Sequence, residues 1–183
     1  MEFTGRVFFD FESFDVWRLY QTALKASRDG SVTVRVTWEE FLAAEVDREQ
    51  PIAPKVRALA ACAAVRDAHP EAWQRFNQAM LTLIFQEKDD PRKDTTLAVA
   101  ARVAGIDGDE TIARALDPGL DLLIASSEEV RKLGVKDVPT VLRDGPPVHI
   151  RLTPAANYGN AVYRIDLINR MLRDDGIWSL TKP

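Results

Sequence analysis

The chain of 183 residues contains a single cysteine, Cys62. One cysteine cannot form an intramolecular disulfide, and it cannot build a cysteine-based metal site alone. Cys62 lies among alanines in a stretch that is typical of a helix, so we expect a small buried apolar side chain. No disulfide is therefore expected. The two histidines, His69 and His149, are far apart in sequence and lack obvious partners, so no metal site is expected either.

The chain also lacks an excess of basic residues and any long apolar run. Its formal net charge is -4, which argues against a protein that follows nucleic-acid phosphates. No apolar run approaches the roughly 20 residues of a membrane span, and the first residues do not have the pattern of a secretion signal. We therefore expect a cytoplasmic protein with neither a nucleic acid nor a membrane as its partner.

The first 40 residues have the pattern of a β-α-β unit. Residues 6–11 are mostly apolar, as in a buried strand, and Ser13 is a good N-cap for a helix with apolar residues at helical spacing. Asp29 and Gly30 close this helix, and residues 31–38 alternate valine with polar residues as in a second strand. The two strands of such a unit run parallel, with a right-handed crossover.

The middle of the chain has a helical pattern with hardly any strand signal. Apolar residues recur at intervals of three and four from about residue 55 to 116. We predict helices around 56–63, 73–83, 95–104 and 110–116, separated by prolines and a glycine turn. A run of this length indicates a helical insertion over 51–119, within a discontinuous domain formed by 1–50 and 120–183.

The last third returns to mixed α/β patterns. A helix over about 120–133 leads to the segment Val138-Pro139-Thr140. Residues 141–142 and 148–152 read as the strands of a hairpin around a Gly-Pro-Pro turn, and 158–173 as a final amphipathic helix. The sequence therefore predicts an α/β fold with its strands at the two ends of the chain.

This order of elements resembles the DsbA-like branch of the thioredoxin superfamily over nearly the whole chain. Residues 85–87 with 104–107 resemble the helical insertion of that family, and 134–140 resemble its cis-proline loop. In the disulfide oxidoreductases of the family a Cys-x-x-Cys motif begins the first helix, but here residues 13–16 are Ser-Phe-Asp-Val. Thiol–disulfide exchange needs an attacking thiolate and a resolving thiol, so we do not expect it at these residues.

Residues 9–13 (Phe-Asp-Phe-Glu-Ser) are similar to a second branch, the kappa-class glutathione transferases and 2-hydroxychromene-2-carboxylate isomerases. In that branch the serine hydroxyl hydrogen-bonds the sulfur of bound glutathione, and the backbone before the cis-proline pairs with the peptide-like part of the cofactor. The resemblance implies glutathione or another low-molecular-weight thiol as cofactor, and a homodimer as one arrangement. It implies Ser13 as the catalytic residue, and as cofactor-binding residues Ser13, Phe14, Val138, Pro139 and Thr140.

Three carboxylates surround the position where a thiolate would lie. Asp10, Glu12 and Asp15 would oppose a second anion there, and Arg18, one turn after Asp15, could offset one of them. Ser13 could also be an ordinary helix cap, and a desolvated Asp15 or Glu12 could be a general base.

Three functions remain open from the sequence. The first is a thiol-dependent transferase or isomerase that uses Ser13. The second is a redox-inactive DsbA-like module that binds a peptide or a small ligand in the groove beside Pro139. The third is a disulfide oxidoreductase that uses Cys62.

Overall fold

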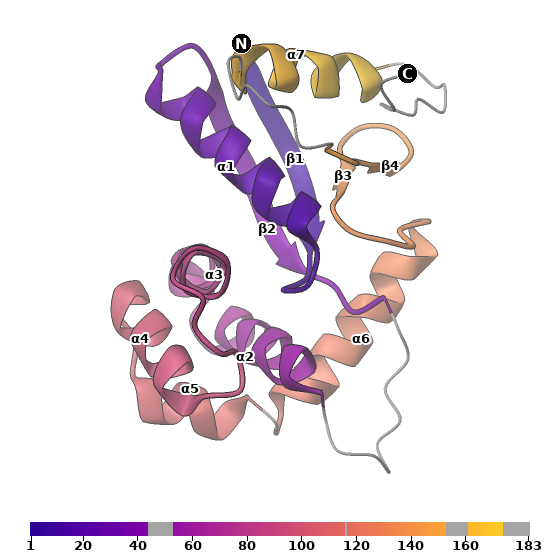
Figure 1. Ribbon diagram of the computed structural model, residues 1–183. Helices are drawn as coiled ribbons and strands as arrows, with labels where there is room; N and C mark the ends of the chain where they lie inside the picture. Colours follow the sequence, from indigo (N-terminus) through magenta and orange to yellow (C-terminus); the bar gives the residue numbers. More distant parts are fainter. Residues whose placement is uncertain (44–52, 116, 153–160, 174–183) are drawn as a thin grey trace.

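The computed structural model describes residues 1–43, 53–115, 117–152 and 161–173. Its centre is a four-stranded sheet in the order β2-β1-β3-β4. Figure 1 shows α1 and α7 side by side against this sheet, with helices α2 to α5 gathered near the end where β1 and β2 finish. Strands from both ends of the chain thus form one sheet, as the sequence predicts.

The predicted β-α-β unit is confirmed. Strand β1 (Glu2–Phe9) pairs in parallel with β2 (Thr33–Glu40) along its whole length, from Glu2 opposite Thr33 to Phe9 opposite Glu40. The strand bounds predicted from the sequence were wrong by two to four residues: β1 begins before residue 6 and ends before 11, and β2 continues beyond 38. The ends of both strands are set by their pairing over eight residues. Polar residues such as Glu2 and Glu40 take part in this pairing, although they do not belong to an apolar pattern that would mark them as strand.

Helix α1 (Phe14–Arg28) begins at the predicted N-cap and buries one face against the sheet. Val16, Leu19 and Ala23 are buried on that face. The helix ends at Asp29, and Gly30 then has a φ of 68°. Helix α7 (Ala161–Met171) packs beside α1, while residues 158–160 of the predicted final helix lie outside the described residues.

The predicted helical segments are present as α2 (Pro54–Ala68), α3 (Pro70–Leu81), α4 (Asp94–Ala104), α5 (Gly108–Arg114) and α6 (Gly119–Lys132). The sequence did not predict the π-helical turn η1 (Thr82–Gln86), in which the predicted helix 73–83 ends. Helix α6 packs along α2. The two helices approach so closely at Gly119 that a Cβ there would lie only 2.5 Å from the carbonyl oxygen of Ala60. The proposed domain boundary at residue 119 stays a prediction.

The predicted hairpin is present but short. Strand β3 (Thr140–Leu142) pairs antiparallel with β1 on one side and with β4 (Val148–His149) on the other. The second strand was predicted to continue to residue 152, but the pairing ends at 149. The pairing with β1 brings the loop before β3 to the end of β1, where α1 begins.

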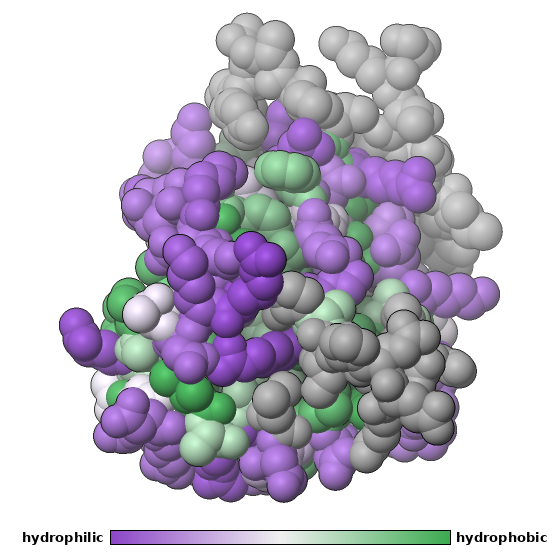
Figure 2. Space-filling view, turned by 60° about the horizontal axis from the view of Figure 1, so that its bottom comes forward, coloured by the Kyte–Doolittle hydropathy of each residue, from purple (hydrophilic) through white to green (hydrophobic). Residues whose placement is uncertain are grey.

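One face of the molecule is mostly hydrophilic where the described residues form it. Figure 2 shows one face on which hydrophilic residues predominate and apolar residues form small groups between them. No helix within the described ranges is long and apolar enough to span a membrane.

Candidate functional site

Ser13 and Val138 meet where α1 begins, although 125 residues separate them in the chain. The Ser13 hydroxyl donates to the Val138 carbonyl oxygen at 3.3 Å. The same oxygen of Ser13 accepts a hydrogen bond from the Val16 amide at 3.4 Å, as an N-cap residue does. The two segments that the sequence singles out therefore form one site, and Ser13 joins them.

The loop around Val138 satisfies its own polar groups. The Val138–Pro139 peptide bond is cis. The Val138 amide donates to the Asp137 carboxylate at 2.8 Å, so both backbone groups of Val138 have partners within the protein. A thiol cofactor that accepted a hydrogen bond from the Val138 amide would have to displace Asp137, whereas the Val138 carbonyl oxygen can accept a second hydrogen bond beside that of Ser13.

Asp10 supports the turn between β1 and α1. One of its carboxylate oxygens accepts hydrogen bonds from the Glu12 amide at 3.0 Å and from the Ser13 amide at 2.8 Å. Burial raises the pKa of the Asp10 carboxyl, and the two amides oppose this rise. The role of Asp10 is thus to hold the backbone of Ser13 in place.

The other two carboxylates of the predicted acidic group have cationic partners. Glu12 pairs with Lys55 at 2.6 Å. Asp15 pairs with Arg18 at 2.9 Å, which confirms the expected pair, and it also accepts a hydrogen bond from the Leu152 amide at 3.3 Å. These contacts give both carboxylates structural roles and leave the idea of a general base at Asp15 or Glu12 without geometric support.

The site opens into a shallow cleft of about 430 Å³. The four carboxylates around this cleft outnumber its two basic side chains. The described residues that line it are Asp10, Glu12, Ser13, Asp15, Asp137, Val138, His149 and Arg151. No group of three His, Cys, Asp or Glu residues within the described parts of the chain could hold a metal ion.

The remaining predicted site residues are placed less favourably for contact with a ligand. Phe14 is 60% exposed and packs edge-on against Phe85 in η1, with the Lys88 ammonium 5.8 Å from its ring. Thr140 is buried, and its hydroxyl donates to the Asp137 carbonyl oxygen. The predicted set therefore divides into Ser13 and Val138, which line the cleft, and Phe14, Thr140 and the buried Pro139, which are not among its lining residues.

Sequence reasoning did not predict three residues of the cleft. Asp137 and His149 come within 3.9 Å of each other, and Arg151 Nε lies 3.4 Å from His149 Nε2. They lie on the loop before β3 and on the chain at and after β4, so only the hairpin brings them together. The one signal that could have indicated Asp137 is its position two residues before Pro139.

Cys62 is not among the residues that line this cleft. It lies in α2, its side chain is fully buried, and burial raises the pKa of its thiol. The prediction of a small buried apolar side chain is confirmed. A buried thiol with a raised pKa is a poor nucleophile, which argues against a disulfide oxidoreductase that uses this residue.

No protein-family model and no curated protein matches the chain. Several solved structures match the chain. A thioredoxin-like oxidoreductase from Silicibacter pomeroyi DSS-3 shares 20% identity over 93% of this chain and 87% of its own, with a TM-score of 0.57. The oxidoreductase DsbA from Xylella fastidiosa shares 15% identity over the same fractions, with a TM-score of 0.57. ScsC from Proteus mirabilis shares 16% identity over 93% of this chain and 81% of its own, with a TM-score of 0.55.

The chain has a DsbA-like thioredoxin fold. The predicted fold class is thereby confirmed, including the helical insertion between the two parts of the sheet. At these identities the likeness concerns the fold, and the activities named for the three proteins are theirs. What the present chain does depends on the site around Ser13.

Proposed function

We propose that this protein is a redox-inactive DsbA-like module that binds an extended peptide with a basic side chain in the cleft beside Pro139. The observation that carries the proposal is the Ser13–Val138 hydrogen bond at the base of the open cleft. A serine that caps a helix and holds the proline loop stands where a redox-active relative would hold a reactive sulfur. The shape of the cleft is thus kept, while the side chain for thiol–disulfide exchange is missing.

The charge of the cleft supports a basic ligand. Lys55 and Arg18 balance Glu12 and Asp15, whereas Asp10 and Asp137 accept backbone amides, and Asp137 has only the His149 imidazole near it among the described residues, at 3.9 Å. The shallow shape of the cleft suits an extended chain that lies across it. We therefore expect a lysine or arginine of the ligand to approach the carboxylates.

The test is selection from a displayed heptapeptide library on immobilised wild-type protein, followed by calorimetry with the selected peptides. The double variant Glu12→Gln/Asp137→Asn makes the cleft more positive by two charges: the first change leaves the Lys55 ammonium without Glu12, the second removes the Asp137 carboxylate, and Asn keeps an acceptor for the Val138 amide. Each exposed charge pair contributes about 0.2–1 kcal/mol, so two of them should change the affinity about 2- to 30-fold.

The control is Asp109→Asn/Glu129→Gln, which removes the same charge from exposed positions on α5 and α6. We expect it to change affinity by less than about twofold. Selected peptides without basic residues, or equal weakening in both double variants, would show that the cleft carboxylates do not bind the ligand.

A second candidate, a thiol-dependent transferase or isomerase, is favoured by the place of Ser13 at the positive end of α1. Its hydroxyl would have to leave Val138 and turn toward a thiolate, and the carboxylates nearby oppose that anion. A thermal-shift titration with glutathione, mycothiol and bacillithiol separates the two proposals. A ligand at 100 times its dissociation constant stabilises a protein by about 2.7 kcal/mol. A shift that Ser13→Ala abolishes would favour the enzyme; no shift with any thiol would favour the binding module.

A further inference from the structure

Strand β2 is an outer strand of the sheet, with β1 on one side and none of the described strands on the other. At the two ends of its pairing with β1, the amides of Thr33 and Phe41 donate to the carbonyl oxygens of Met1 and Phe9. The odd-numbered residues of β2 therefore turn their backbone groups toward β1. The even-numbered residues turn theirs away from it.

Helix α3 satisfies these outward backbone groups near the end of β2. The Gln74 side chain accepts from the Trp38 amide at 2.8 Å and donates to the Trp38 carbonyl oxygen at 3.0 Å. Asn77 donates to the same oxygen at 2.9 Å. Within the part of the chain that the structure describes, no group bonds the outward N–H and C=O of Val34 and Val36. The first part of β2 is thus an open edge with which another strand can pair.

A groove of about 200 Å³ lies between α1 and this open edge. Two buried aromatic side chains of the groove, Tyr20 and Trp38, pack edge-on with their ring centroids 5.3 Å apart. The volume is below the roughly 300–1,000 Å³ of small-molecule sites, so the groove suits one or two side chains. The apolar residues that line it are Tyr20, Ala23, Leu24, Val34, Val36 and Trp38.

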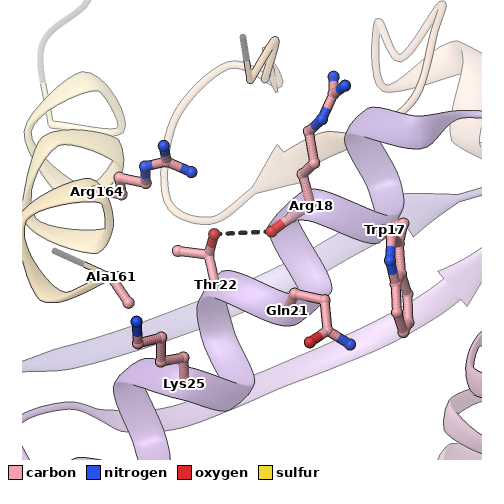
Figure 3. Close-up of a pocket in the computed structure, with 7 residues that line it drawn as sticks. All are labelled: Trp17, Arg18, Gln21, Thr22, Lys25, Ala161 and Arg164. Carbon is pink, nitrogen blue, oxygen red and sulfur yellow. Dashed lines mark hydrogen bonds between the residues drawn. The ribbon is translucent and has the colours of Figure 1, made fainter. Parts of the chain in front are cut away.

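Helix α7 does not close this groove. Figure 3 shows Thr22 and Lys25 of α1 pointing toward Ala161 and Arg164 of α7. None of the residues drawn at this contact lines the groove between α1 and β2. The described residues that bound the groove belong to α1, β2 and, at Gln78, to α3.

The open edge has a different character on its two faces. Successive residues of a strand point to opposite faces, so Val34 and Val36 point into the groove and Arg35 points to the other face. Arg35 is the one charged residue of the segment 33–37, and its side chain is 70% exposed, with Glu2 3.6 Å away. An added strand would therefore meet apolar side chains on one face and a cation on the other.

A second copy of β2 is a less suitable partner for this edge. In the antiparallel register that pairs Val34 with Val36 of the copy, the two Arg35 side chains would lie directly opposite each other. Like charges in this position are destabilising, whereas an acidic side chain opposite Arg35 would form a favourable cross-strand pair.

We propose that the open edge of β2 binds an extended partner segment in which apolar residues alternate with an acidic residue. The segment adds a strand to the sheet through the backbone groups of Val34 and Val36. Its apolar side chains occupy the groove, and its carboxylate lies beside Arg35. This surface shares no residue with the cleft beside Pro139, so it does not depend on the function proposed for that cleft.

The test is an NMR titration of the ¹⁵N-labelled full chain with the acetylated and amidated peptide Val-Thr-Val-Glu-Val-Thr-Val. In the free protein, the amides of Val34 and Val36 should exchange with solvent at least about tenfold faster than those of Arg35 and Thr37, which face β1. The peptide should slow exchange at Val34 and Val36 at least about tenfold. The absence of binding, or binding that leaves these two amides unprotected, would overturn the assignment.

Charge reversal tests the acidic character of the partner. The wild type should bind this peptide at least about threefold more tightly than the same peptide with lysine in place of glutamate. Arg35→Glu should invert the preference, because its carboxylate would lie beside the lysine of the second peptide. The matched control Arg102→Glu makes the same change at an exposed position on α4 and should keep the preference of the wild type. An unchanged preference in Arg35→Glu, or an inversion in both variants, would overturn the assignment.

Methylated peptides test strand addition without any change to the protein. Successive amides of a strand point to opposite sides, so only alternate amides of the peptide can face β2. N-methylation of the valines and N-methylation of the residues between them should therefore differ, with a loss of at least about tenfold in one peptide and less than about twofold in the other. Equal losses would overturn strand addition. A dimer of the free protein in sedimentation that itself protects Val34 and Val36 would assign the edge to a second copy and overturn the acidic partner.

Discussion

A buried carboxylate, Glu40, should make the protein less stable as the pH rises. The side chain of Glu40 is fully buried at the end of β2. Arg66 Nη1 lies 2.9 Å from one carboxylate oxygen as an ion pair, and the Trp73 indole donates to the other oxygen at 3.1 Å. These partners only partly replace the water that Glu40 loses on folding.

The magnitude follows from the pKa. Burial raises the pKa of Glu40 from 4.5 to about 7, although the positive charge of Arg66 opposes this rise. Between these two values the folded protein binds more protons than the unfolded chain, so the free energy of unfolding falls as the pH rises through this window. Each pKa unit corresponds to 1.36 kcal/mol, which gives a loss of about 3 kcal/mol between pH 4.5 and 8.

The assay is urea unfolding of the wild type and of Glu40→Gln at several pH values between 4.5 and 8. Gln can accept the hydrogen bond of Trp73 but carries no charge to desolvate. The variant should therefore gain stability relative to the wild type as the pH rises, by up to about 3 kcal/mol at pH 8. Glu129→Gln, which removes an exposed carboxylate on α6, should show no such trend.

The change with pH is the decisive quantity, because it does not depend on any constant offset that the substitution introduces. If the stability curves of the wild type and Glu40→Gln run parallel from pH 4.5 to 8, Glu40 is not held in the folded state with a raised pKa. A variant that loses stability relative to the wild type as the pH rises would reverse the argument.

Two further predictions concern stability. Gly119→Ala should destabilise the fold by about 1–3 kcal/mol in urea unfolding, because its Cβ would lie 2.5 Å from the Ala60 carbonyl oxygen. The control Gly145→Ala, with no atom within 4 Å of its Cβ, should be near neutral. Equal effects of the two substitutions would contradict the close packing of α2 and α6. Ser13→Ala should cost about 1 kcal/mol through loss of the helix cap. Ser13→Thr should recover most of this loss in the same assay, and no loss in Ser13→Ala would remove the structural role of this hydroxyl.

Much of the fold could be predicted because its signals are local. Ser13 caps a helix through its own neighbours, and the alternation of residues 31–38 is a property of that strand alone. The ends of β1 could not be predicted, since the partner strand decides them. The turn η1 was missed because no local pattern shows that Phe85 packs against Trp17 and Phe14.

The site was predictable only in its two anchor segments. Ser13 and Val138 followed from the resemblance, and the structure brings them together. The contributions of His149 and Arg151 depend on how the hairpin folds back, which no local pattern specifies. Glu40 was missed for a similar reason: its ion-pair partner, Arg66, lies 26 residues further along the chain and on another element.

The most direct test of the proposed function is an NMR titration of ¹⁵N-labelled protein, once with a selected basic peptide and once with glutathione. The account predicts that the peptide shifts the amide signals of Ser13, Val138 and Arg151 and that glutathione leaves them unchanged. Saturable shifts of the same amides by glutathione, lost in Ser13→Ala, would contradict it and establish a thiol site instead.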